Sequence, residues 1–257
     1  MRRFLKVLPL TLALVLALAG MGLVLTSCNS SQAQARFVDA IGSLNQTEID
    51  IEVDGGRDFT SLTFPSYQPT SGYRPVASGS DTIEGVISGG TTSEFSTPNV
   101  NLSSGSEYTL VATGVAPNNV IILNPTDDNS EPANGQVSFR IIDAAISSPS
   151  QLAVYILPNQ ENGQPPTITS STPVTAAPTG PSSPATATSA YETQSFNSLN
   201  TGFTGEVCTF GSTIPIFTFA IANFGGANEG AIRTIVLTDN SSQTGFDPSP
   251  LILSDLN

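Results

Sequence analysis

The chain has 257 residues, with 8 basic residues, 21 acidic residues, two cysteines and no histidine, and its formal net charge is −13. The absence of histidine excludes the serine–histidine–aspartate and cysteine–histidine arrangements that activate a nucleophile, and zinc sites built on histidine. The acidic balance excludes nucleic-acid binding, because phosphates must be met by clustered cations.

Residues 1–27 have the features of a secretory signal peptide. The opening MRRFLK carries three positive charges, and a mostly apolar run follows from Val7 to Leu25. The next residues, Leu25-Thr-Ser-Cys28, resemble the lipobox of bacterial lipoproteins, which is cut just before the cysteine. That resemblance implies a diacylglycerol thioether on Cys28 and an amide-linked acyl chain. Such chains anchor firmly, because each buried methylene contributes roughly 0.8 kcal/mol.

A plain cleaved signal and a single transmembrane helix are the alternatives. Pro9, Gly20 and Gly22 interrupt the apolar run and count against a helix. Lipidation predicts an extracytoplasmic protein anchored to the cell membrane or to an outer membrane. Asn29, the residue after Cys28, favours the outer membrane by analogy with lipoprotein sorting. Residues 28–34 would then form a short lipidated tether.

Cleavage would make the net charge of the protein more negative. It removes three basic residues and no acidic one, which leaves 5 basic and 21 acidic residues and a net charge of −16. An anionic lipid surface would repel such a protein, so acyl chains must hold it at the membrane. Cys208 would be the remaining cysteine, and we expect a small buried apolar residue, because no histidine can activate its thiol.

The region after the tether shows an all-β pattern. In residues 48–56, EIDIEVDGG, the apolar residues Ile49, Ile51 and Val53 alternate with acidic ones, which predicts a strand with one buried face and one solvent-facing side. The Asp-Gly-Gly at its end predicts a turn, with a hairpin as the favoured form. Further strands are expected at 61–64, 81–87, 107–114 and 119–123.

A second unit follows a polar, turn-rich linker at 126–136. Its residues 140–144, RIIDA, resemble RFVDA at 36–40, so that Arg36 aligns with Arg140 and Asp39 with Asp143 at an offset of 104. At an offset of 103, the inward positions of the first strand align with Leu152, Val154 and Ile156. This pattern predicts a duplicated β unit, because burial constrains one face of a strand and solvent tolerates change on the other.

Residues 161–195 interrupt the second unit. They are rich in proline, serine, threonine and alanine and lack the apolar residues that pack a core. We expect a long, mostly disordered surface excursion, of which part could add an edge strand. The strand pattern resumes at 202–211, 214–225 and 231–240, and residues 250–257 could supply a last strand.

Several of these segments resemble the bacterial envelope domain catalogued as domain of unknown function 4397. They are RFVDA, EIDIEVDGG, SGYRPVASGSDTIEGV, LSSGSEYTLVATG, LNPTDDNSEPANGQVSFRIIDA and AIRTIVLTDN, and the resemblance extends over nearly all of 35–250 apart from the insertion at 161–195. The resemblance implies an exported β-sandwich-like domain, often in tandem and often lipidated, without an established activity. The family usually has a His-Ala-Ser-Pro-type run after its first strand, where Asp39 and Asp143 stand here, so no role of that histidine transfers.

Carboxylates and oxygen ligands are the remaining candidates for chemistry. A glycosidase needs two carboxyl groups at a set separation, and candidates by residue type are Asp39, Glu48, Asp50, Glu52, Asp54 and Asp58. A solvated strand face is the preferred explanation for Glu48, Asp50 and Glu52. Weak calcium candidates in the linker are Asp127, Asp128, Asn129 and Glu131. Tyr67 and Tyr73 could form a sugar or peptide platform, but core or edge packing is favoured.

We therefore expect two tandem immunoglobulin-like β-sandwich domains after a lipoprotein signal peptide. The units are 35–125 and 137–257, separated by the linker at 126–136. The predicted function is a lipid-anchored binding, adhesive or structural module of the cell envelope, without catalytic residues or cofactor. Its predicted partners are membrane lipid through Cys28 and an envelope polysaccharide or protein. The alternative is a carbohydrate-active enzyme that uses carboxylates.

Overall fold

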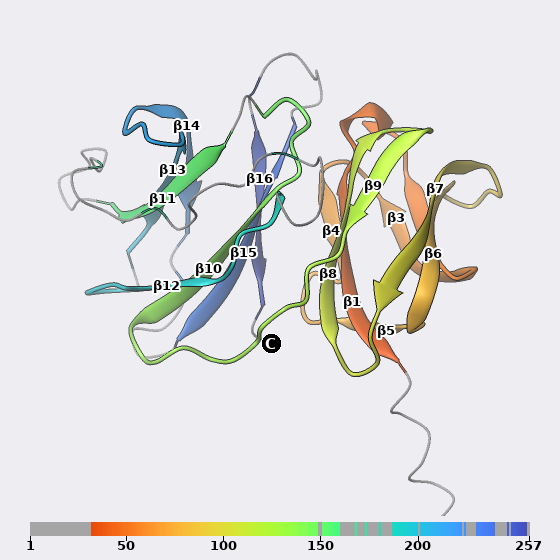
Figure 1. Ribbon diagram of the computed structural model, residues 1–257, viewed down its shortest axis with the longest axis horizontal. Coiled ribbons are helices and arrows are strands. Elements are labelled where there is room, and N and C mark those ends of the chain that lie inside the picture. Colours follow the sequence, from red (N-terminus) through yellow and green to blue (C-terminus); the bar gives the residue numbers. More distant parts are fainter. Residues whose placement is uncertain are drawn as a thin grey trace, which may run out of the picture.

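The computed structural model consists almost entirely of β-strands in four sheets (Figure 1). It describes residues 32–148, 151–159, 168, 173, 180, 187–199, 201–222, 224, 230–239, 246 and 248–255. The predicted all-β fold is confirmed. No helix in these ranges has the length and apolar character needed to span a bilayer. Cys28 and the predicted signal peptide lie outside the described residues.

The elements of the first half are β1 (Ala33–Ala40), the 3-10 helix η1 (Gly42–Leu44), β2 (Ile49–Val53), β3 (Gly56–Leu62), β4 (Ser66–Gln68), β5 (Arg74–Val76), β6 (Gly79–Ile87), β7 (Ser93–Leu102), β8 (Glu107–Val115) and β9 (Asn119–Leu123). Those of the second half are β10 (Gln136–Asp143), β11 (Leu152–Pro158), β12 (Glu192–Ser195), β13 (Phe203–Thr209), β14 (Pro215–Ile221), β15 (Ala231–Thr238) and β16 (Ser249–Ser254).

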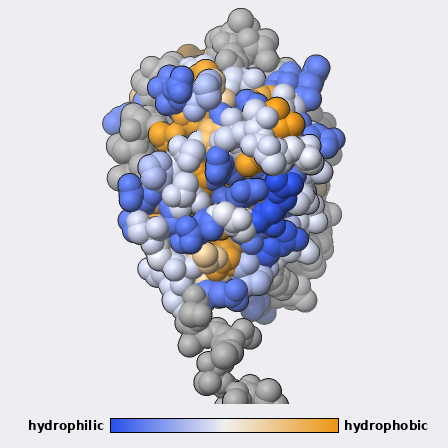
Figure 2. Space-filling view, turned by 90° about the vertical axis from the view of Figure 1, so that its right-hand side faces the viewer, coloured by the Kyte–Doolittle hydropathy of each residue, from blue (hydrophilic) through white to orange (hydrophobic). Residues whose placement is uncertain are grey.

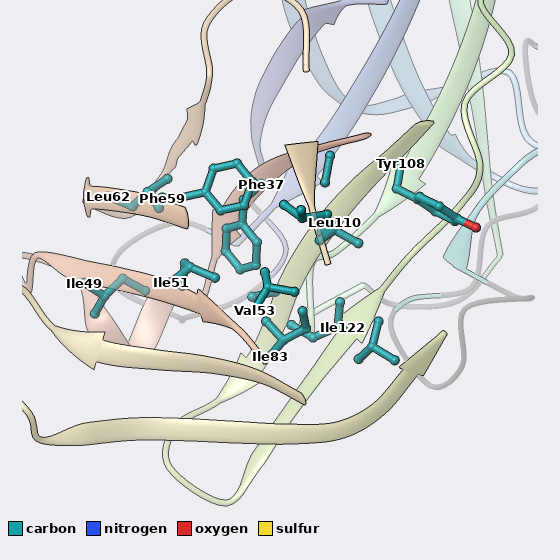
Figure 3. Packing of buried hydrophobic residues seen from close by; sticks show 14 of the residues in the cluster. Phe37, Ile49, Ile51, Val53, Phe59, Leu62, Ile83, Tyr108, Leu110 and Ile122 are labelled. Atoms are coloured by element: carbon teal, nitrogen blue, oxygen red, sulfur yellow. The ribbon is translucent and has the colours of Figure 1, made fainter. Parts of the chain in front are cut away.

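The first half forms a sandwich of two sheets. Sheet A has the strand order β4-β1-β8-β9, with β5 also paired to β1, and sheet B has the order β3-β2-β6-β7. The β1–β8 pair is parallel, and the other pairs are antiparallel. Apolar side chains from both sheets meet between them, as Figure 3 shows for Phe37 and Leu110 of sheet A and Ile51 and Phe59 of sheet B.

Strand β2 follows the predicted alternation on its inner face. Ile49, Ile51 and Val53 are buried in the core between sheets A and B. The strand ends at a two-residue turn in which Asp54 (φ 49°) and Gly55 (φ 79°) both have positive φ. Positive φ at both central residues gives a turn whose twist matches paired strands, so β3 returns beside β2 as the predicted hairpin.

The second half repeats this arrangement. Sheet C has the order β12-β10-β15-β16, and sheet D has the order β11-β13-β14. The β10–β15 pair is parallel. The predicted inward residues Leu152, Val154 and Ile156 are buried in a second core between sheets C and D. Strand β12 lies within the predicted excursion at 161–195 and pairs at the edge of sheet C, which confirms the expected edge strand.

A third apolar cluster joins the two halves. Val38 and Val111 of sheet A pack with Ile142 and Val236 of sheet C, and Leu253 completes the contact. Sheets A and C therefore lie face to face, and the four layers follow the order B-A-C-D across the long axis (Figure 1). The outer face of sheet B is mostly hydrophilic, and its hydrophobic residues are scattered (Figure 2).

Candidate functional site

Two arginines lie buried on the strands that face each other across the molecule. Arg36 on β1 is opposite Thr109 in the parallel β1–β8 pair, and Arg140 on β10 is opposite Thr234 in the parallel β10–β15 pair. They are only 2% and 1% exposed, respectively. A buried guanidinium needs an acid and further acceptors, because an unpaired charge inside a protein is very costly.

Each arginine finds its acid in the other half of the molecule. Arg36 donates from Nε to Thr109 Oγ1 at 2.9 Å, from Nη1 to the Ser254 carbonyl at 2.9 Å, and from Nη2 to Asp255 Oδ1. Asp255 directly follows β16, the strand at the edge of sheet C. The first half thus supplies the base and the second half supplies the acid.

Arg140 makes the reciprocal set of contacts. It donates from Nε to Thr234 Oγ1 at 3.2 Å, from Nη1 to the Thr126 carbonyl at 3.1 Å, and from Nη2 to Asp127 Oδ1 at 2.5 Å. Here the base comes from the second half and the acid from the first. The two arginines are therefore related as the members of a twofold interface would be.

Hydroxyl groups and aromatic rings complete both ends of this network. Thr109 and Tyr73 donate to Asp127 at 2.7 Å each, and Thr234 and Tyr191 donate to Asp255 at 2.7 and 2.9 Å. The arginines also lie over tyrosine rings, Arg36 at 5.3 Å from the Tyr73 centroid and Arg140 at 4.7 Å from that of Tyr191. The crossed network is the name used below for Arg36, Arg140, Asp127, Asp255, Thr109, Thr234, Tyr73 and Tyr191.

The electrostatics of the crossed network indicate a structural role. Burial alone would lower the pKa of Arg36, but Asp255, Tyr73 and Asp127 raise it above its ordinary value. Burial raises the pKa of both tyrosines, and a neighbouring aspartate adds to the rise in each. The charges of the two arginines and the two aspartates balance, and all four side chains are buried from water. These groups hold the halves together and are not poised to exchange protons with a substrate.

The four calcium candidates do not converge on one point. Asp127 belongs to it, with its side chain fully buried. Asn129 donates to Glu107, and Asp128 accepts from the Ser130 amide at 3.0 Å in an exposed turn, where Glu131 is exposed too. Among the described residues, no group of three or more histidine, cysteine, aspartate or glutamate side chains is placed to hold a metal ion. The calcium site stays a prediction.

The predicted solvent-facing row of β2 is wrong for Asp50. This residue is 3% exposed, accepts from the Ser61 amide and the Ser88 hydroxyl at 2.8 Å each, and contacts Arg57 at 3.1 Å. Burial raises its pKa, but these partners outweigh burial and hold the pKa below its ordinary value. The cause is an irregular register in the β2–β3 pair, where Ser61 has φ 53° and turns its amide onto Asp50.

Glu52 lies at the same arginine as Asp50, because Arg57 contacts both carboxylates at 3.1 Å. Glu48 and Asp54 are exposed. Burial raises the pKa of Asp58.

Asp39 and Asp143 occupy equivalent buried positions at the ends of β1 and β10. Burial raises the pKa of Asp39 to about 7 and that of Asp143 to about 6. Asp143 accepts hydrogen bonds from Ser148 and from the amides of Ala145 and Gly180, whereas Asp39 Oδ2 has no partner among the described residues.

The remaining sequence candidates are packing residues. Cys208 is a buried free thiol whose pKa is raised by burial and by Glu206, as expected for a small buried residue. Tyr67 packs against the cluster between sheets A and C, and the Tyr73 hydroxyl binds Asp127. Both are half-buried, so the favoured packing interpretation is confirmed.

A groove of about 470 Å³ lies in the second half, and the sequence did not indicate it. It is lined by Ile156, Leu157, Pro158, Thr193, Gln194, Ser195, Phe196 and Asn197. Among the described strands, β11 pairs only with β13 and β12 only with β10, so the groove lies between two edge strands of facing sheets. In the first half, β3 covers the corresponding side of β2. No lining residue is charged.

These features define an all-β protein of two face-to-face sandwiches, with a buried network of charges between them and an uncharged groove in the second half. The chain belongs to the family described as "Domain of unknown function (DUF4397)", whose model matches residues 13–155, more than half of its length. No curated protein matches the chain.

Several solved structures show distant similarity to the chain, and three of them are described below. The chain is similar to the Bacillus anthracis TIE protein (13% identity, 81% of this chain and 34% of that one, TM-score 0.24). It is also similar to a family CBM26 module of Eubacterium rectale Amy13K in complex with maltoheptaose (8% identity, 84% of this chain and 96% of that one, TM-score 0.27). The third is a Bacteroides ovatus protein described as a "putative adhesin" (9%, 89% and 98%, TM-score 0.26). The chain thus spans about a third of the TIE protein. Scores this low carry no functional argument.

Proposed function

We propose that this protein is a lipid-anchored module of the cell envelope that binds, adheres or supports, and that its ligand site is the groove beside β11 and β12. The proposal includes a signal peptide at 1–27, a lipidated tether at 28–34, and two duplicated units at 35–125 and 137–257. The matched parallel pairs that place Arg36 opposite Thr109 and Arg140 opposite Thr234 support the duplication.

The uncharged groove is the observation that carries the binding proposal. The Thr193 and Ser195 hydroxyls already bond side chains of β10, whereas Asn197 offers an amide group and Pro158 an exposed apolar surface. The surface of the groove is more polar than apolar, which suits a ligand recognised through hydrogen bonds. The acidic chain repels anions, so we expect a neutral ligand, such as a segment of envelope polysaccharide or an uncharged stretch of protein.

The composition of the groove favours binding over catalysis. A carboxylate-dependent glycosidase needs two carboxyl groups facing one cleft, and no carboxyl group lines the groove. The serine and threonine hydroxyls there have no histidine or lysine that could activate them, because the mature chain would contain neither residue. No observation favours the enzymatic alternative.

Intact-mass analysis of the membrane-fraction protein tests the anchor. We expect a mass that lacks residues 1–27 and includes a diacylglycerol and an acyl chain on Cys28. The mass of the full 257-residue chain would rule out the anchoring proposal.

Glycan and envelope-protein arrays probed with the detergent-extracted mature protein test the groove. Asn197→Arg would place a bulky charge at the groove and should abolish the signal. Asn118→Arg, a matched change at an exposed residue of the β8–β9 turn, should leave the signal unchanged. An equal signal from both variants would exclude the groove as the site, and turnover of a sugar polymer would overturn the assignment as a binding module.

A further inference from the structure

The hairpin between β13 and β14 carries an unusual concentration of exposed apolar side chains. Phe210 is 54% exposed, Ile214 is 75% exposed and Ile216 is 43% exposed. They are three of the six large hydrophobic residues that are exposed in the described part of the chain, and they fall within seven residues. The tip cluster is the name used below for these three residues. Clustered apolar exposure marks a contact surface more often than single exposed residues do.

The tip is held in place by its own hydrogen bonds. The Ser212 amide donates to the Thr209 carbonyl at 2.9 Å, and the Ile214 amide donates to Ser212 Oγ at 3.1 Å. The Phe210 amide donates to the Gln151 carbonyl at 2.8 Å, beside the start of β11. The apolar side chains are therefore presented by an ordered turn, so contact with a partner requires little further ordering.

No charge accompanies the tip cluster. Residues 207–222 contain no acidic or basic side chain, although the mature chain would carry a net charge of −16. The neighbouring Glu206 is only 5% exposed. A neutral, apolar tip on an acidic body disfavours an anionic partner.

The tip cluster lies away from the point at which the chain enters the fold. The β13–β14 hairpin belongs to the outermost layer, sheet D, and lies at the upper left of Figure 1, whereas β1 begins at the lower right. If the N-terminus is anchored in one membrane, the β13–β14 hairpin lies on the side of the fold away from that anchor (Figure 1).

The small size of the tip cluster favours a lipid partner over a protein partner. A stable protein interface buries about 800 Å² on each partner and involves about 20 residues or more, which is far beyond three side chains on a narrow hairpin. Insertion into the interfacial region of a bilayer scales with the apolar area that is buried and requires no directed polar contacts, and here it would add to the proposed lipid anchor.

We propose that the tip cluster inserts into a neutral lipid bilayer that faces the anchored protein. This inference rests on the proposed lipid anchor, which places the protein on a first membrane. The protein then bridges two lipid surfaces, with acyl chains at its N-terminus and the hairpin at the opposite end.

A single introduced tryptophan tests the insertion, because the chain contains none. Full-length Ile214→Trp protein is reconstituted in donor vesicles and mixed with acceptor vesicles of phosphatidylcholine or brominated phosphatidylcholine. We expect a blue-shifted emission that the brominated acceptor lipid quenches at least twofold. Val115→Trp, at a 39% exposed apolar position on the β8–β9 hairpin, is the matched control and should show neither effect.

A loss-of-function pair provides a second readout. Ile214→Ser combined with Ile216→Ser should lower docking of acceptor vesicles at least tenfold, whereas Val115→Ser should leave docking unchanged. Quenching equal to that of the Val115→Trp control would overturn the inference. So would a blue shift without quenching, since the tip would then lie in a protein pocket. Co-flotation with the donor vesicles reports the anchor separately, so its failure is distinguishable from failure of the tip.

Discussion

Asp39 is a carboxyl group buried at the end of β1 with one oxygen bound to the Ile41 amide at 3.0 Å and the other without a partner among the described residues. Burial raises its pKa from 3.8 to about 7. A group whose pKa is higher in the folded state stabilises the protein fully below the unfolded pKa. That contribution is lost as the pH rises from about 4 through 7.

Asp39→Asn should therefore remove a pH dependence. We expect the free energy of unfolding of the wild type to fall between pH 4 and 7 by an amount on the order of 3 kcal/mol from this group. The variant should lack that part of the slope and be the more stable protein at pH 8. Urea denaturation at each pH measures this. Asp128→Asn should instead be less stable than the wild type at pH 8. Hydrogen bonds with Ser130 lower the pKa of Asp128, so its ionised form stabilises the folded state. An Asp39→Asn curve parallel to wild type would contradict the prediction.

Asp127→Asn tests the crossed network at the level of one residue. The amide would leave Arg140 buried without its acid, and removing one partner of a buried ion pair costs about 3–5 kcal/mol. We expect a loss of this size in the free energy of unfolding, measured by urea denaturation. Adding Arg140→Met should recover part of the loss, because no charge is then stranded. Equal stability of Asp127→Asn and wild type would show that the pair is not required.

Sheets B and D each contain a strand glycine that is covered by a phenylalanine ring on the neighbouring strand. Gly85 on β6 lies opposite Phe95 on β7, and Gly205 on β13 lies opposite Phe219 on β14. In each pair the ring covers the glycine, so that a Cβ atom would fall 2.1 Å from Phe95 Cε1 or 2.2 Å from Phe219 Cζ. Aromatic cover of a strand glycine fixes register between neighbouring strands.

Gly85→Ala should destabilise the protein although alanine suits a strand better than glycine. The new methyl group would force the Phe95 ring out of the core, at a cost of about 1–3 kcal/mol. Thermal unfolding followed by circular dichroism measures the loss. Gly85→Ala with Phe95→Leu should be less destabilised than the sum of the single changes, because the smaller side chain makes room. Strict additivity would argue against the ring contact.

Sequence patterns were sufficient for local structure and insufficient for long-range contacts. Alternation placed Ile49 and Leu152 correctly in their cores, because inward positions depend only on period two. It failed for Asp50, since a register irregularity in a neighbouring strand brings Ser61 over it. The sequence repeat aligned Arg36 with Arg140 but did not indicate which acids they bind, because Asp255 is 219 residues from Arg36. The groove was missed because β11 and β12 become neighbouring edges only after folding.

The molecule as a whole is held together by the contact between sheets A and C. The apolar cluster there and the crossed network both span the halves, so an unbroken chain between Asp127 and β10 is not needed to keep them together. A protease site inserted at 130–134, an exposed stretch apart from half-buried Pro132, should allow cleavage without separation. The cleaved halves should co-elute in size-exclusion chromatography and separate only in denaturant. Separation in native buffer would contradict this expectation.

The distance in sequence between Arg36 and Asp255 has a consequence for biosynthesis. A ribosome adds about 5–20 residues per second. The 219 positions between the two residues therefore take roughly 10–40 seconds to make. Throughout that time Arg36 of the nascent chain lacks its hydrogen-bonded acid, although Asp127, 3.8 Å away in the folded protein, is translated earlier. The first sandwich therefore cannot complete this contact until Asp255 has been made.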